Sequence, residues 1–184
     1  MNAWANLEYR DPEEVLRWLR ALERETAGLD LSDRVRRLRT GDLKDVRGLR
    51  DAALFSHSLA AATGHRVYFA PHEAQDYDFV TAWRLADQRH FCPVQLKEVP
   101  PADLNASTSL EDVLRNLGKY SQTDTALAVL LNKPCTLAGE QLSALRIPFC
   151  QLWLFWCASA DGESWVIQGD VLDSPARYPF RYPT

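Results

Sequence analysis

The first third of the chain carries apolar residues at helical spacing. Residues 11–27 follow Asp11, a residue suited to capping a helix, and form one apolar stripe made of Val15, Leu16, Trp18, Leu19 and Leu22. The same spacing recurs over residues 42–63 and stops at Gly64, a residue that often ends helices. A short basic helix is expected between them, at residues 31–38. These patterns predict a helical start to the chain.

From residue 66 onward, β-branched and aromatic residues in shorter runs predict strands. The expected strands are residues 66–70, 76–85, 91–99, 125–132, 149–158 and 165–169, and the expected helices are residues 110–120 and 136–145. Residues 71–75 should break the first strand, because they begin with Pro71. The tail from residue 174 onward should be a packed extended arm.

Consecutive strands that then cross over through a helix predict an α/β fold with a mixed central β-sheet flanked by helices. The chain has 184 residues, which fits one such domain with a helical extension. We expect residues 1–40 to form an N-terminal helical extension and residues 41–184 to form the α/β domain, together in one compact unit.

Charge is unevenly distributed. The formal net charge is −4, which excludes a uniformly basic nucleic-acid-binding protein but leaves room for a local basic patch. One segment is rich in cations, namely Arg34, Arg36, Arg37, Arg39, Lys44 and Arg47. This segment is either a solvated helix face or a surface that contacts phosphates.

Several classes are disfavoured by what the sequence lacks. The four cysteines form no C-x-x-C pair, so we expect buried free thiols, and the four histidines lack metal-ligand spacing. No apolar stretch reaches the ~18 residues typical of a membrane span. The N-terminal residues are charged, without the apolar core of a signal peptide. We therefore expect a cytoplasmic protein that does not bind membranes.

Three polar residues on two neighbouring predicted strands suggest chemistry. Side chains alternate along a strand, so Gln95 and Lys97 share one face. If residues 86–90 form a hairpin turn, Asp78 lies beside Gln95. A carboxylate and an amide oxygen are hard ligands suited to Mg²⁺ or Mn²⁺, and a neighbouring lysine can stabilise charge during phosphodiester hydrolysis. Alternatively, Asp78 caps a turn and the other two form the solvated face of an edge strand.

Asp78, sixteen further residues and then Gln95-Leu96-Lys97 resemble the PD-(D/E)XK nuclease superfamily. Over residues 42–132, the expected order of a helix, three strands, a helix and a strand is similar to the core of that superfamily. The resemblance implies a restriction-endonuclease-like fold and hydrolysis of DNA. It also implies that Asp78 and Gln95 bind the metal, while Lys97 assists the nucleophile.

The motif departs from its usual form at two positions. Tyr77 replaces the motif proline, and Gln95 replaces an acidic residue, as in the Mrr-like branch of the superfamily. Other residues near the motif could supply negative charge or an accessory polar group: Asp51, Glu73, Glu98, Lys119 and Gln122.

Two functions follow as hypotheses. The first is a metal-dependent nuclease that acts on DNA. The second is a catalytically inactive module of the same fold that binds nucleic acid or a protein partner, in an accessory or immunity-type role. The aromatic run at residues 151–156 is either a strand buried on both faces or an interface, for example that of a homodimer.

Overall fold

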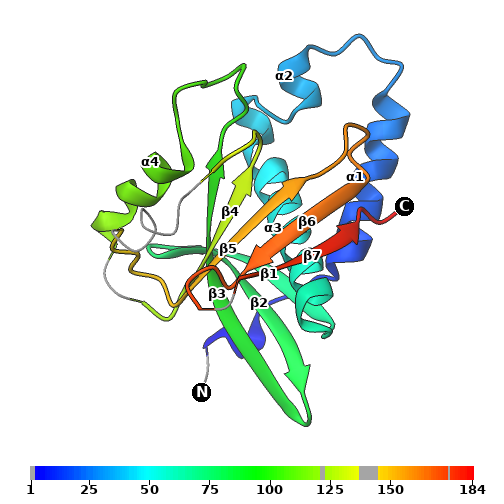
Figure 1. Cartoon of the computed structure of the whole chain (residues 1–184). Helices are drawn as coiled ribbons and strands as arrows, with labels where there is room; N and C mark the ends of the chain where they lie inside the picture. Colours follow the sequence, from blue (N-terminus) through cyan, green and yellow to red (C-terminus); the bar gives the residue numbers. More distant parts are fainter. Residues whose placement is uncertain (1–2, 121–122, 137–144, 174) are drawn as a thin grey trace.

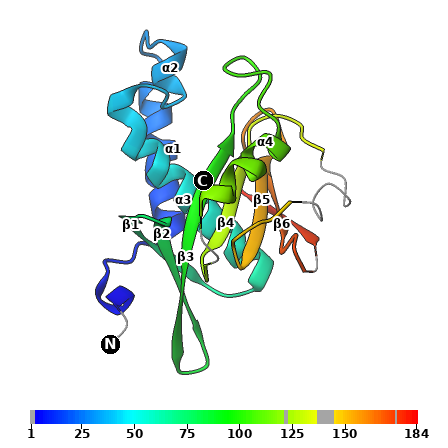
Figure 2. The same ribbon diagram turned by 90° about the vertical axis from the view of Figure 1, so that its left-hand side faces the viewer.

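The computed structural model describes residues 3–120, 123–136, 145–173 and 175–184. A seven-stranded mixed sheet crosses the molecule, with α1 and α3 on one face and α4 on the other (Figures 1 and 2). The helical segments are η1 Ala3–Asn6, α1 Pro12–Thr26, α2 Asp33–Arg36, η2 Gly41–Leu43, α3 Lys44–Thr63, α4 Leu110–Arg115 and η3 Asn116–Lys119. The strands are β1 Val67–Ala74, β2 Tyr77–Leu85, β3 Gln88–Val99, β4 Ala126–Leu131, β5 Gln151–Cys157, β6 Ser164–Gly169 and β7 Ala176–Arg181.

Local sequence accounts for the limits of the two long helices. The Asp11 side chain accepts a hydrogen bond from the backbone N–H of Glu13 at 2.9 Å and so caps α1. Gly64 ends α3 with φ of 71°, a left-handed conformation that glycine adopts without the steric cost of a side chain. Both predicted helices are therefore confirmed.

The strands lie in the sheet in chain order, from β1 to β7. β3, β4 and β5 run parallel, and the remaining neighbours pair antiparallel. The predicted mixed sheet with flanking helices is confirmed. The crossover from β3 to β4 contains α4 and η3. The helix expected at residues 136–145 falls on residues 137–144, which lie outside the described part of the chain.

Two strand predictions were wrong. β1 does not break at Pro71 but continues to Ala74, with a register shift between these two residues. β1 is an edge strand of the sheet, where a proline is tolerated because a missing N–H costs no ladder bond on the open side. The C-terminal tail is a seventh strand, in which Pro179 pairs with Val166 of β6.

The sheet has a hydrophobic core on each face. The first lies under α1 and α3 and includes Phe55, Phe79 and Phe155, each almost completely buried. The second lies under α4 and includes Leu114 and Leu127. β5 contributes to both cores, which confirms the prediction of a strand buried on both faces for most of the aromatic run.

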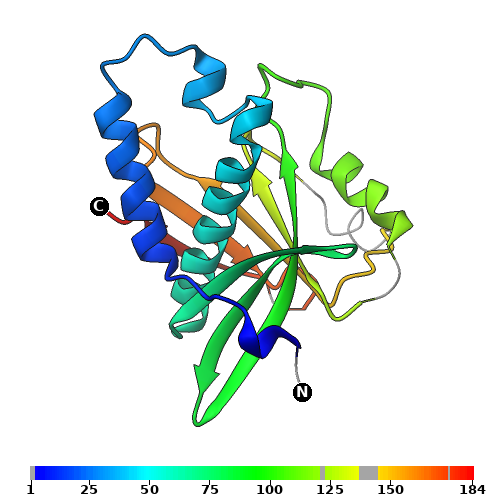
Figure 3. The same ribbon diagram turned by 180° about the vertical axis from the view of Figure 1, so that it is seen from behind.

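The N-terminal helix is part of the main core. Leu16 of α1 is fully buried in the same cluster as Phe55. α1 runs alongside α3 (Figure 3). The Tyr182 hydroxyl donates a hydrogen bond to the Leu16 carbonyl at 3.3 Å, so the C-terminal segment also holds α1. The boundary at residue 40 between a helical extension and the α/β domain stays a prediction.

Some burial predictions were wrong. Trp18 and Leu22 belong to the expected apolar stripe of α1 but are 56% and 40% exposed. The four cysteines are free, as expected, but Cys150 and Cys157 are exposed. Among the helices that the structure describes, none is long and apolar enough to cross a membrane.

Candidate functional site

β2 and β3 part at Asp78. Their antiparallel pairing runs from Leu85 opposite Gln88 to Phe79 opposite Val94. Beyond Val94, β3 no longer pairs with β2, and it continues as far as Val99 with β4 as its one strand partner among the described residues. Its residues 95–97 therefore have a free side next to the start of β2.

Asp78 fills this gap with its side chain. One oxygen of its carboxylate accepts a hydrogen bond from the Leu96 backbone N–H at 2.6 Å and another from the side-chain amide of Gln95. Gln95 is buried, with 4% of its surface exposed. The predicted proximity of Asp78 and Gln95 is confirmed. The carboxylate replaces the backbone partner that β3 loses where β2 departs.

Lys97 lies two residues further along β3 and is half-buried. Its Nζ is 5.5 Å from the centre of the Tyr120 ring, a distance at which a cation is attracted to the face of an aromatic ring. Lys97 and Asp78 both line one cleft, which rules out the arrangement in which they lie on unconnected surfaces.

The cleft has a volume of about 700 Å³ and lies between the start of α3, the end of β1 and the point where β2 and β3 part. Five of the residues predicted as catalytic or accessory line it: Asp51, Glu73, Asp78, Lys97 and Glu98. Fold topology therefore brings together residues that are up to 47 positions apart in the sequence, from Asp51 to Glu98.

Two of the acidic residues in the cleft are already paired. Asp51 is buried and accepts hydrogen bonds from Nε and Nη2 of Arg50 at 3.0 and 2.9 Å. Burial raises the pKa of Asp51, with Arg50 acting in the opposite direction. Glu98 forms a bidentate ion pair with Arg39 and accepts a hydrogen bond from the Asn132 side chain at 2.5 Å. Glu73 is exposed.

The donors available to a metal are few. Among the described residues, no group of three or more His, Cys, Asp or Glu side chains is placed to hold a metal ion. The site offers the second oxygen of Asp78, which lines the cleft, and the amide oxygen of Gln95, which is buried and does not line it. Mg²⁺ commonly binds through only one or two carboxylates and keeps several waters, so these donors fit it in kind.

The basic segment divides into two groups. Arg36 donates to the carbonyls of Ala27, Leu29 and Leu31, and Arg37 pairs with Asp103. Arg39 is committed to Glu98, as described above, and Arg34 is exposed. Lys44 and Arg47 line the cleft. These last two are the cations of the segment that face the candidate site.

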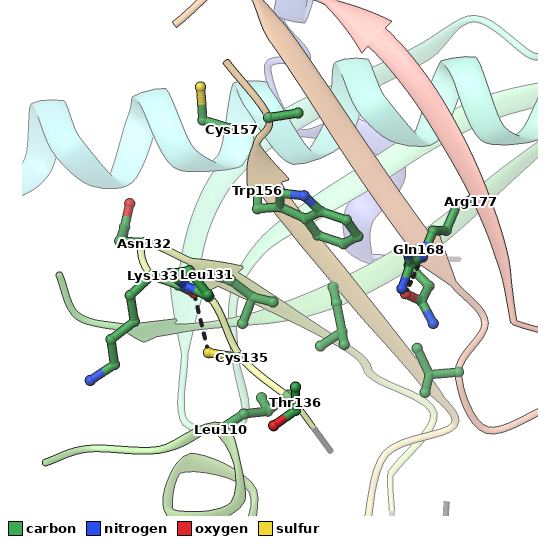
Figure 4. Close-up of a pocket in the computed structure, with 14 residues that line it drawn as sticks. Leu110, Leu131, Asn132, Lys133, Cys135, Thr136, Trp156, Cys157, Gln168 and Arg177 are labelled. Atoms are coloured by element: carbon green, nitrogen blue, oxygen red, sulfur yellow. Dashed lines mark hydrogen bonds between the residues drawn. The ribbon is translucent and has the colours of Figure 1, made fainter. Parts of the chain in front are cut away.

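A second cavity, of about 780 Å³, was not expected from the sequence (Figure 4). It lies at the carboxyl ends of β4 and β5, and its wall includes Trp156, with the guanidinium of Arg177 5.6 Å from the ring centre. Arg177 also donates to the side chain of Gln168 at 3.0 Å. Of the predicted site residues in the described chain, none lines this cavity. One related sign was present in the sequence, the aromatic run that includes Trp156, which was predicted to be a buried strand or an interface.

Two accessory predictions cannot be placed. Lys119 is the last residue of η3, and its side chain lies outside what the structure describes. Gln122 also lies outside the described residues.

No protein-family model matches the chain, and neither does any curated protein sequence.

Proposed function

We propose that this chain is a metal-dependent nuclease with a restriction-endonuclease-like core, which hydrolyses phosphodiester bonds in DNA. The observation that carries the proposal is the hydrogen bond between Gln95 and Asp78 where β2 and β3 part, together with the cleft that Asp78 and Lys97 both line. The order α3, β1, β2, β3, α4 and β4 supports it, because the resembled superfamily has the same order of elements.

In this proposal Asp78 and Gln95 hold the metal through their free oxygens. Bound Mg²⁺ or Mn²⁺ would polarise the scissile phosphate and lower the pKa of a coordinated water. Lys97 places a positive charge beside the phosphate and offsets the negative charge that develops there. The Tyr120 ring next to Nζ limits the positions that Lys97 can adopt.

Lys44 and Arg47 serve the same site from α3. Both line the cleft, and neither forms an ion pair within the described residues. Their charges are therefore available to neutralise substrate phosphates. This supports a substrate backbone that enters along the first turns of α3.

The amide at Gln95 sets the expected metal affinity. A site with one carboxylate attracts a divalent cation less strongly than a site with two, because one negative charge is missing. We therefore expect cleavage to need millimolar metal concentrations.

The pairing of acidic residues favours a second candidate function, the non-catalytic module that binds nucleic acid or a protein partner. Asp51 and Glu98 are committed to Arg50 and Arg39, so neither adds a free carboxylate to the cleft. In this case Asp78 would act only to join β2 to β3. A homodimer remains a prediction under either function.

Cleavage assays separate the two functions. Plasmid, linear duplex and single-stranded DNA are incubated with the protein in Mg²⁺ or Mn²⁺, beside the Lys97→Ala and Asp78→Asn variants. Lys133→Ala serves as the matched lysine control, because Lys133 lines the other cavity. We expect cleavage by the wild type and the control but not by the site variants. Equal inactivity of all four proteins on every substrate would leave only the binding module.

A further inference from the structure

One large aromatic side chain lies exposed beside the cleft. Trp18 of α1 is 56% exposed, whereas Leu16 and Leu19 on the same helix are buried. Trp18 borders a shallow cavity of about 470 Å³, together with Tyr9 and Val15. A single exposed apolar side chain is common on protein surfaces, so it is the cavity beside Trp18 that suggests a binding role.

This shallow cavity adjoins the cleft that contains Asp78 and Lys97. Arg10 and Leu49 line both cavities, so the two cavities adjoin and are together referred to as the groove. The groove leads from the exposed ring of Trp18 to the candidate site.

The two ends of the groove offer different contacts. Four cations line the cleft end and form no ion pair in the part of the chain that the structure describes: Arg10, Lys44, Arg47 and Lys97. Five acidic residues also line it, of which Asp51 and Glu98 are paired with arginines, while Asp45, Glu73 and Asp78 form no ion pair among the described residues. At the Trp18 end, Asp11 is paired with Arg66, and Arg10 is the one cation among the described residues that line it. The unpaired cations of the cleft can hold a phosphate, and the indole of Trp18 offers an aromatic face at the other end.

We infer that the substrate is a single-stranded nucleic acid, one base of which stacks on Trp18 while a neighbouring phosphate lies in the cleft. This inference rests on the proposed nuclease function. In a duplex, both faces of each internal base are covered by its neighbours, so the base cannot stack on a protein side chain. An unpaired base has a free face, and every base has one, so the contact selects for single strands without selecting a sequence.

Equilibrium binding tests the inference without cleavage. The anisotropy of a labelled single-stranded oligonucleotide and of its duplex is measured in EDTA, with the wild type, Trp18→Leu and Trp18→Phe. Leucine keeps an apolar side chain but loses the aromatic face, whereas phenylalanine keeps that face. Leu172→Ala is the control, since Leu172 is 41% exposed and lines neither end of the groove.

We expect Trp18→Leu to weaken single-strand binding about tenfold, which corresponds to the loss of one stacked base. Trp18→Phe should retain most of the affinity, and Leu172→Ala should retain all of it. Tighter binding of the duplex than of the single strand would overturn the inference. Unchanged single-strand affinity in Trp18→Leu would do the same, and would leave a protein partner as the occupant to test at this surface.

Failure of this inference differs from failure of the nuclease proposal. If the wild type cleaves DNA, Lys97→Ala does not, and Trp18→Leu binds single strands as tightly as the wild type, then the stacking inference fails and the nuclease proposal stands. If the wild type cleaves nothing while Trp18→Leu loses single-strand affinity, the nuclease fails and the groove remains a single-strand binding surface.

Discussion

The carboxylate of Asp78 accepts the backbone N–H of Leu96 at 2.6 Å, at the position where β2 leaves β3. A side chain thus takes the place of a strand partner. The same oxygen also accepts the amide of Gln95. Asp78 consequently has a structural role in addition to its proposed role as a metal ligand, and variants of it must be interpreted with both roles in mind.

Asp78→Ala should destabilise the protein by about 1–3 kcal/mol, because the N–H of Leu96 and the buried amide of Gln95 lose their acceptor. Asp78→Asn keeps an acceptor oxygen and should cost less. Urea unfolding of the two variants measures the difference. An alanine variant as stable as the wild type would show that these hydrogen bonds contribute nothing.

Gln95→Glu would restore the acidic residue of the usual motif. Two carboxylates would then lie side by side, so their repulsion should lower the melting temperature in EDTA. A divalent cation relieves that repulsion and binds the folded state, so Mg²⁺ should raise the melting temperature of the variant more than that of the wild type. Thermal unfolding with and without Mg²⁺ measures both effects. An equal Mg²⁺ shift in the two proteins would argue against a metal at this position.

Lys44 and Arg47 should contribute to nucleic-acid binding, whereas Arg37 should not, because Arg37 already pairs with Asp103. In the Lys44→Ala/Arg47→Ala variant, the slope of log K against log salt for single-stranded DNA should fall by about 1.4, from the loss of two phosphate contacts. Titrations at several salt concentrations give the slope. An equally large change in Arg37→Ala would place the phosphates elsewhere.

The buried Asp51 should make stability depend on pH. Burial raises its folded-state pKa above the ordinary value of 3.8, and the negative charge of Glu98 raises it further. The positive charges of Arg50 and Arg47 lower the pKa, but burial is the largest effect on Asp51. The stability it contributes is therefore fully present below pH 3.8 and is lost as the pH rises through the folded-state pKa. Asp51→Asn should remove this loss.

Unfolding free energies of the wild type and Asp51→Asn, measured between about pH 4 and about pH 8, should therefore diverge in favour of the variant as the pH rises. Parallel curves would show that Asp51 titrates alike in both states.

Periodicity predicted the helices and central strands because burial of one face or of both leaves a regular trace in the sequence. It failed at β7, where Pro179 and its neighbours were predicted to form a packed extended arm and not a strand of the sheet. An edge strand needs hydrogen bonds on one side only, so a segment with poor strand propensity can still join the sheet. Trp18 was also misplaced: its helical spacing groups it with the buried Leu16 and Leu19, but it is 56% exposed.

Strand alternation and the motif were enough to predict the part of the candidate site that lies on β2 and β3. Asp78 and Gln95 are placed together by one hairpin, which is a local relationship. The pairing of Glu98 with Arg39 was not predictable, because it joins residues 59 positions apart through the packing of the basic segment against the end of β3. The large cavity beside Trp156 was missed since it depends on how separate strands end in space.

Lys97 is the residue on which the proposed hydrolysis of phosphodiester bonds most depends. The most direct measurement is the single-turnover rate of DNA cleavage at saturating Mn²⁺ for the wild type and Lys97→Met, a variant that keeps the length of the side chain and removes its charge. We predict a rate at least about a hundredfold lower for Lys97→Met, the loss expected for one preorganised charge-stabilising group. Equal rates in the two proteins, or no cleavage by the wild type under any condition, would contradict the account.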